Sequence, residues 1–138
     1  MGRTPPHLNI NLDTARHVGG QIMEFDMDWN ENRTQLLRNV GALQKLSPDT
    51  VKGYLTVSGA GRKTAQLDEK MRQLISLAVA VTTRCDGCIS IHSSEALKAG
   101  ATREELAEAL SVAVAMNAGA ALVYSTRALE AFDTATDA

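Results

Sequence analysis

The chain has few aromatic residues, no excess of positive charge and no long apolar run. Aromatic side chains make up 4% of its 138 residues, so the core is built from Ala, Leu, Val, Ile and Met, which favours closely packed helices. A formal net charge of -2 without any Lys/Arg run argues against nucleic-acid binding. The longest strongly apolar run, Leu74 to Val81, is far shorter than the roughly 20 residues that cross a bilayer. We therefore expect no nucleic-acid partner and no membrane partner.

Cysteine is scarce, and the N-terminus lacks a secretory signal. Met1 to Pro6 contain no apolar stretch of the kind that a signal peptide requires. The two cysteines, Cys85 and Cys88, form a close pair. In a chain without an export signal, such a pair suits a reducing cytosol, where disulfides are usually transient and catalytic. We expect a cytoplasmic protein.

No alternating strand pattern occurs, whereas helical periodicity begins near Asn30. The length suits one domain with a real core. We therefore expect residues 1–26 to form an irregular N-terminal extension and residues 27–138 to form an all-α domain. His7 and His17, in the extension, have no Cys or His partner at a metal-ligand spacing, so we read both as surface or packing residues.

Start and stop signals divide the domain into five expected helices. Ser47 before Pro48 is an N-cap followed by proline at the first helical position, Asp68 can cap the central third helix, and Thr102 with Glu105 forms a capping box. The expected helices run from about Asn30 to Leu46, from Pro48 to Gly59–Gly61, from Asp68 to Val81, from Asp86 to Lys98 and from Thr102 onward. Arg62 to Thr64 would be a connection, and Asn117–Gly119 would kink the last helix.

The most informative motif is Cys85-Asp86-Gly87-Cys88 followed by His92. At the start of a helix the two cysteines lie one turn apart, so their sulfurs can bridge. Such a bridge encloses only two residues and stabilises the fold little, which favours reversible chemistry. A helix start also stabilises a thiolate. His92, four residues after Cys88, lies on the same helical face, where it can accept the thiol proton or donate one to a leaving oxygen.

Other interpretations of this motif are weaker. A single Cys-x-x-Cys occurs by chance, and His92 could be a packing histidine. Zinc would have Cys85, Cys88 and His92 as ligands but no fourth ligand at a recognisable spacing. A thioredoxin fold would need a strand before the motif and a βαβ pattern, and the sequence has neither.

The motif and its flanks carry a family resemblance. The runs Leu67–Ala80, Cys85–Cys88 with His92, and Ala99–Glu105 together resemble the AhpD-like alkylhydroperoxidases of the carboxymuconolactone decarboxylase family. The resemblance covers about Met27 to Phe132. It implies an all-helical domain that forms an obligate homo-oligomer, a homotrimer or homohexamer. It also implies peroxide reduction through a dithiol/disulfide cycle, with no metal, flavin or haem cofactor.

The resemblance further implies roles for single residues. Cys88 corresponds to the family's peroxidatic cysteine, Cys85 to its resolving cysteine and His92 to the histidine of a proton relay. The family's relay glutamate, twelve residues before the first cysteine, is Gln73 here. Because a glutamine can orient His92 but cannot exchange a proton near neutral pH, Glu69, one turn earlier, could take over that task.

We therefore expect an enzyme, an alkylhydroperoxidase-like peroxidase that takes a hydroperoxide as substrate and an unidentified dithiol as reductant. The alternatives are a redox-sensing or dithiol-exchange protein without efficient peroxidase activity, and a lactone decarboxylase in which both cysteines would be incidental. The sequence leaves open the peroxide, the reductant, and the choice between trimer and hexamer.

Overall fold

The computed structural model describes residues 27–136, and every regular element in that range is a helix. The helices are α1 (Trp29–Leu46), α2 (Pro48–Thr64), α3 (Glu69–Thr82), α4 (Asp86–Lys98) and α5 (Arg103–Thr136). The expected all-α fold is confirmed. The extension assigned to residues 1–26, with His7 and His17, lies outside the described residues.

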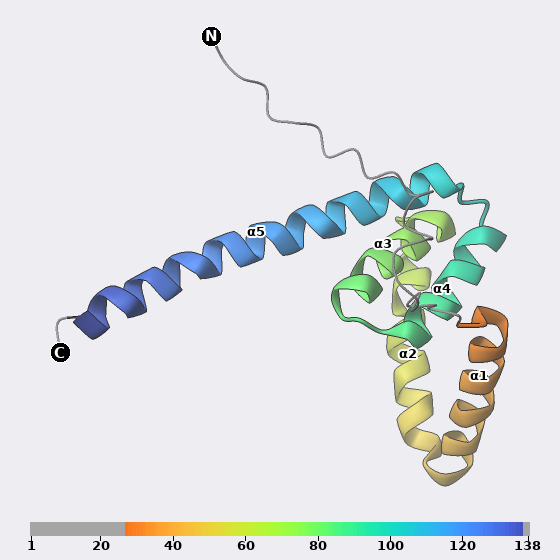
Figure 1. Ribbon diagram of the computed structural model, residues 1–138. Helices are drawn as coiled ribbons and strands as arrows, with labels where there is room; N and C mark the ends of the chain where they lie inside the picture. The colour runs from red at the N-terminus through yellow and green to blue at the C-terminus, as the bar shows by residue number, and fades with distance from the viewer. Residues whose placement is uncertain (1–26, 137–138) are drawn as a thin grey trace, which may run out of the picture.

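The third helix is central, as the sequence predicts. It packs against α4 and against the first part of α5, and α1 packs against both α2 and α4 (Figure 1). The small core lies where α3 faces α4 and α5, around Leu74, Leu77, Ala80, Ala96 and Ala113. The rest of α5 extends far beyond the other helices (Figure 1).

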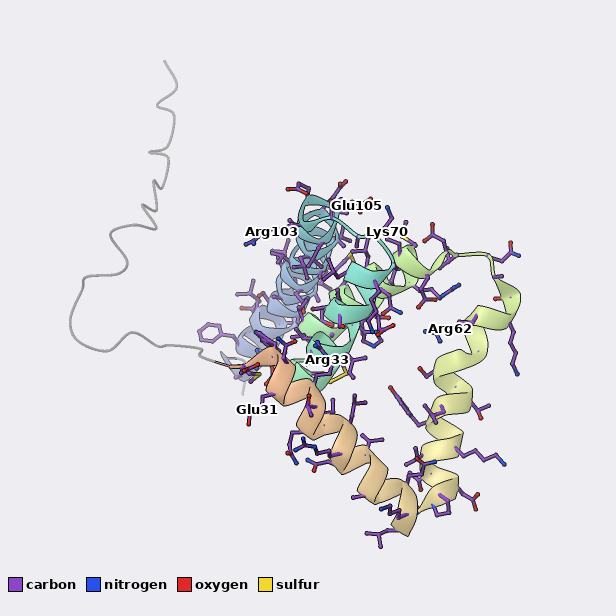
Figure 2. The ribbon with its side chains drawn as sticks, turned by 90° about the vertical axis from the view of Figure 1, so that its right-hand side faces the viewer. Glu31, Arg33, Arg62, Lys70, Arg103 and Glu105 are labelled. Carbon is purple, nitrogen blue, oxygen red and sulfur yellow. A yellow bond between two sulfur atoms is a disulfide. The ribbon has the colours of Figure 1, made fainter. Side chains whose placement is uncertain are left out.

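Two predicted helix starts are present in detail. Asp68 Oδ1 accepts a hydrogen bond from the Met71 N–H at 2.7 Å, which caps α3. At α5 the Glu105 N–H donates to Thr102 Oγ1 at 3.2 Å, and the Thr102 N–H donates to Glu105 Oε2 at 2.9 Å. This reciprocal pair is a capping box. Glu105 also pairs with Lys70 Nζ at 2.6 Å, which ties the start of α5 to the start of α3 (Figure 2).

The second helix departs from the prediction at both ends. Ser47 makes no side-chain capping bond, and its Oγ lies 2.8 Å from Thr50 Oγ1 instead. The helix does not end at Gly59–Gly61 but continues to Thr64, and Ala65 ends it with a left-handed φ of 50°. A glycine lowers helix stability by about 1 kcal/mol but removes no hydrogen bond, so these glycines weaken the helix without stopping it.

The last helix is also unbroken, so the kink expected at Asn117–Gly119 is wrong. Asn117 Nδ2 donates to the Ala113 carbonyl one turn earlier at 2.7 Å, which satisfies its amide within the helix. By length and composition Arg103–Ala135 would pass as a membrane-spanning helix, a test that core helices of soluble proteins also pass. The sequence predicts this helix but not its membrane-helix composition, because small and polar residues interrupt its apolar ones.

Much of the apolar surface of the single chain is uncovered. Six apolar side chains are buried in the described residues, whereas α1, α2 and α5 leave many large ones in solvent. Examples are Leu46 at 85% exposure, Val57 at 77% and Leu122 at 72%. Monomeric proteins rarely expose large contiguous apolar patches, so these faces are candidate interaction surfaces.

Candidate functional site

The two cysteines are joined by a disulfide at the start of α4 (Figure 2). Their Cα atoms lie 5.2 Å apart. Cys85 is the N-cap residue of α4, and its Sγ accepts a hydrogen bond from the Cys88 N–H at 3.2 Å. The sulfurs therefore occupy the helix start that the sequence predicts, where backbone N–H groups favour negative charge.

A tight reversal between α3 and α4 places this helix start. Arg84 has a left-handed φ of 53°, which is uncommon for a residue other than glycine. The Cys85 N–H donates to the Ala80 carbonyl at 3.0 Å, so the loop stays bonded to the end of α3. This reversal lays α4 back along α3.

Helix α1 lies directly against the redox motif. A Cβ at Gly87, between the cysteines, would lie 2.9 Å from Leu36 Cδ2. Ser90 is 1% exposed, and its Oγ donates to the Trp29 carbonyl at 3.0 Å. Arg33 Nη1 donates to the Ser90 carbonyl at 3.2 Å. These contacts were not predicted, because helical periodicity shows which face of α1 is apolar and not which element that face contacts.

His92 is connected to α3 through Gln73. His92 Nδ1 lies 2.7 Å from Gln73 Oε1, and Gln73 Nε2 donates to Glu69 Oε1 at 2.5 Å. Gln73 is only 4% exposed, so water has little access to its amide. The structure thus brings together three of the five predicted site residues in one hydrogen-bonded chain, while Cys85 and Cys88 lie at the start of the helix that carries His92.

Two arginines hold the far end of this chain. Glu69 Oε1 lies 3.0 Å from Arg62 Nη2, and Glu69 Oε2 lies 3.1 Å from Arg72 Nη2. The hydrogen bond from Gln73 and then that from Arg72 lower the pKa of Glu69 below its usual value. Glu69 therefore remains a carboxylate near neutral pH. Arg62 was missed because the sequence predicts a loop where α2 in fact continues.

The histidine has a lowered pKa. Burial is the largest cause because it disfavours the charged imidazolium. Glu95 raises the pKa, Arg62 lowers it and Glu69 raises it, in that order of size. The ring is therefore largely neutral near neutral pH and can accept a proton.

The described residues contain no group of three or more His, Cys, Asp or Glu side chains that could hold a metal ion. Since the sulfurs of Cys85 and Cys88 are bonded to each other, they form no thiolate ligand pair in this state. An open depression of about 480 Å³ lies beside Glu69, at the end of the hydrogen-bonded series that links Glu69, Gln73 and His92. Its walls come from Asp68, Glu69, Lys70, Glu95, Lys98 and Ala99.

The sequence matches known proteins over most of the domain. Residues 48–131 match the family model of the carboxymuconolactone decarboxylase family, a range that includes the redox motif and excludes α1. An uncharacterized protein of Haemophilus influenzae is 50% identical over 105 residues, which are 76% of this chain and 93% of that protein. An uncharacterized protein of Cupriavidus necator is 35% identical over 106 residues, 77% of this chain and 94% of that protein.

Solved structures agree with this match. The crystal structure of an apo carboxymuconolactone decarboxylase family protein from Legionella pneumophila has a TM-score of 0.61 and 37% identity. It covers 76% of this chain and 94% of that one. A structure from Methanobacterium thermoautotrophicum has a TM-score of 0.56 and 37% identity, and covers 61% of this chain and 94% of that one.

Proposed function

The chain belongs to the carboxymuconolactone decarboxylase family, and from this membership and the site geometry we propose that it is a dithiol peroxidase that reduces hydroperoxides in the cytoplasm. Cys88 is the peroxidatic residue, Cys85 resolves the oxidised product, and His92 transfers the proton. The substrate class is an organic hydroperoxide or hydrogen peroxide. The cycle uses no metal, flavin or haem.

The first step oxidises Cys88. Neutral His92 accepts the thiol proton of Cys88, and the helix start stabilises the thiolate. The thiolate sulfur attacks the outer oxygen of the hydroperoxide, so an S–O bond forms as the O–O bond breaks. The leaving alkoxide takes the proton back from His92. The products are an alcohol, or water from hydrogen peroxide, and the sulfenic acid of Cys88.

The second step forms the disulfide. The Cys85 sulfur attacks the Cys88 sulfur, so that an S–S bond forms, the S–O bond breaks, and hydroxide leaves as water with the proton of Cys85. An external dithiol then reduces the disulfide by exchange and is itself oxidised to a disulfide. The Cα separation of 5.2 Å in the bridged state lies within the range usual for disulfides.

The observation that carries this proposal is the placement of His92. It lies one turn beyond Cys88 on α4, and its ring is held through Nδ1 by a buried glutamine. A histidine fixed in this way, beside a disulfide at a helix start, supports proton transfer to and from sulfur.

Peroxide turnover tests the proposal. Reduced protein with dithiothreitol should consume cumene hydroperoxide or hydrogen peroxide over many cycles, and Cys88→Ser should abolish consumption above the rate of dithiothreitol alone. A serine preserves the size of the side chain, and unchanged circular dichroism would show that the fold is intact. A wild-type protein that consumes neither peroxide would contradict the proposal.

A dithiol-exchange function is the second candidate, and the cap of α4 favours it. Since Cys85 Sγ accepts the Cys88 N–H, the helix start can also stabilise a thiolate on Cys85. It would then attack the disulfide of a partner. Reduction of insulin disulfides by wild type without peroxide consumption, together with a mixed disulfide trapped on Cys85 in Cys88→Ser, would favour this candidate. A lactone decarboxylase would need neither cysteine.

A further inference from the structure

The two hydrogen bonds that link Glu69, Gln73 and His92 allow only one assignment of donors and acceptors. Ionised Glu69 has no hydrogen to donate, so the NH₂ group of Gln73 faces it, at 2.5 Å. The carbonyl oxygen of Gln73 therefore faces His92 Nδ1, at 2.7 Å. Because this oxygen only accepts, Nδ1 must carry the hydrogen. In the neutral ring, Nε2 is then left with a free lone pair.

We infer that Gln73 and Glu69 are positioning residues that lock His92 in the tautomer protonated at Nδ1, with Nε2 as the base. The tautomer lock follows from the hydrogen bonds alone. Its importance for the reaction rests on the proposed function, in which this lone pair receives the thiol proton of Cys88. A ring protonated at Nε2 instead would have its lone pair turned toward Gln73, away from any substrate.

The surroundings support a rigid lock. Gln73 is 4% exposed, so water competes little for its amide. Glu69 lies one turn before Gln73 on the same face of α3, and Arg62 and Arg72 hold its two oxygens in place. The amide of Gln73 is therefore oriented by a carboxylate that itself pairs with two arginines.

A glutamate at position 73 would behave differently. It would place a second carboxylate beside Glu69, and two carboxylates at this distance cannot both remain ionised easily. One of the two carboxylates would bind a proton, and that proton could be shared with Glu69 or with His92. A glutamine carries no exchangeable charge, so it sets the direction of the hydrogen bonds without acting as a proton donor itself.

The charged groups around His92 come from three helices. They are Glu95 on α4, Glu69 on α3 and Arg62 on α2. Replacement of Glu69 would therefore change both the charge near the His92 ring and the direction of the hydrogen bonds that reach it through Gln73. Glu95 offers a matched control, because it acts on His92 only through its charge and forms its ion pair with Lys98.

The test is the tautomer of His92, read from the ¹⁵N chemical shifts of its two ring nitrogens in histidine-labelled protein in the disulfide form. The His92→Gln variant assigns the signal among the three histidines. We expect Nδ1 protonated and Nε2 bare in wild type at neutral pH. In Glu69→Gln, two amides face each other and can pair in either direction, so both tautomers should appear. Glu95→Gln should lower the pKa of His92 and leave the tautomer unchanged.

A second readout links the lock to chemistry. The rate of Cys88 oxidation in a single turnover should fall in Glu69→Gln at neutral pH, by up to roughly 100-fold, which is the low end of what general acid–base catalysis contributes. Glu69→Asp keeps a carboxylate that only accepts hydrogen bonds from Gln73, so this variant should recover part of the lost rate. Glu69 is near the surface, so its replacement should leave the circular dichroism and the melting temperature close to wild type.

Two results would overturn the inference: wild-type His92 protonated at Nε2, or a tautomer that Glu69→Gln leaves unchanged. The two proposals fail separately. A locked tautomer in a protein that consumes no peroxide would contradict the peroxidase proposal and leave the lock standing. An active peroxidase in which His92 populates both tautomers would contradict the tautomer lock and leave the peroxidase proposal standing.

Discussion

At the scale of single residues, the site residues differ in what made them predictable. Cys85, Cys88 and His92 lie within eight positions of one another, so helix geometry alone relates them. The contact of His92 with Gln73 depends on the packing of α4 against α3, and only the family resemblance pointed to Gln73 from the sequence. Arg62 had no such support. It acts on Glu69 from a helix that the sequence predicts to have ended.

The lowered pKa of His92 predicts a pH dependence of stability. In the unfolded chain a histidine titrates near 6.5, whereas burial lowers the pKa in the folded state. At a pH between the folded and the unfolded pKa of His92, the unfolded chain binds more protons than the folded one. The contribution of His92 to the free energy of unfolding is therefore fully present above about pH 6.5, and it is lost as the pH falls through the folded pKa.

Chemical denaturation of wild type and His92→Gln at one protein concentration, between about pH 5 and pH 8, measures this contribution. The free energy of unfolding of wild type should fall more steeply toward acid than that of His92→Gln. His7 and His17 are present in both proteins and cancel in the comparison. Parallel curves would mean that the folded state does not disfavour the His92 imidazolium.

At the scale of elements, two of the three predicted side-chain caps are present, whereas the continuation of α2 through its glycines and of α5 through Asn117–Gly119 was not predicted. Asp68 and the Thr102–Glu105 capping box form hydrogen bonds within one helical turn, so the sequence spacing of their residues predicts them. Gly59 to Gly61 and Asn117 to Gly119 have low helix propensity, but propensity differences of about 1 kcal/mol are small beside the packing of a whole helix. The contact of α1 with the redox motif depends on tertiary packing and had no local signal.

The contact between α1 and Gly87 gives a prediction about packing. In Gly87→Ala the new methyl group gains up to about 1 kcal/mol of helix propensity but meets Leu36 Cδ2 at 2.9 Å, and overpacking costs typically 1–3 kcal/mol. We expect a net loss of stability of about 1 kcal/mol. Because Leu36 is the cause, the loss should vanish or reverse in a Leu36→Ala background, with a coupling energy of about 1 kcal/mol.

Denaturant unfolding of the two single variants and the double variant measures this coupling. Gly53→Ala is the matched control, because a Cβ there meets nothing within 4 Å, and it should be neutral or stabilising. Additive effects of Gly87→Ala and Leu36→Ala would show that α1 does not lie against the motif in solution.

At the scale of the whole molecule, the uncovered apolar faces support a homo-oligomer. Along α5 the exposed side chains include Leu122, Val123, Leu129 and Phe132, each between 64% and 72% exposed. A second copy of the chain offers the same apolar faces, which suits a symmetric assembly. We propose that copies of this chain cover one another here, as the family resemblance implies for a trimer or hexamer.

Sedimentation velocity tests this assembly. Wild type should sediment as one species larger than a monomer at micromolar concentration without detergent. Leu122→Glu should reduce its size or precipitate it, because a charge would be buried in the interface, whereas Leu122→Met should leave it unchanged. A stable wild-type monomer would contradict the proposal, and so would wild-type protein that dissolves only with detergent.

The most direct measurement of the central claim is the intact mass of the protein after one equivalent of peroxide, taken under non-reducing conditions. Fully reduced wild type should lose two hydrogen atoms and form no covalent dimer, because Cys85 resolves Cys88 within the chain. Cys85→Ser should gain one oxygen instead, as a sulfenic acid that dimedone captures, and Cys88→Ser should not change. Oxidation of Cys88→Ser with an inert Cys85→Ser would exchange the two roles, and wild type that stays reduced would contradict the peroxidase account.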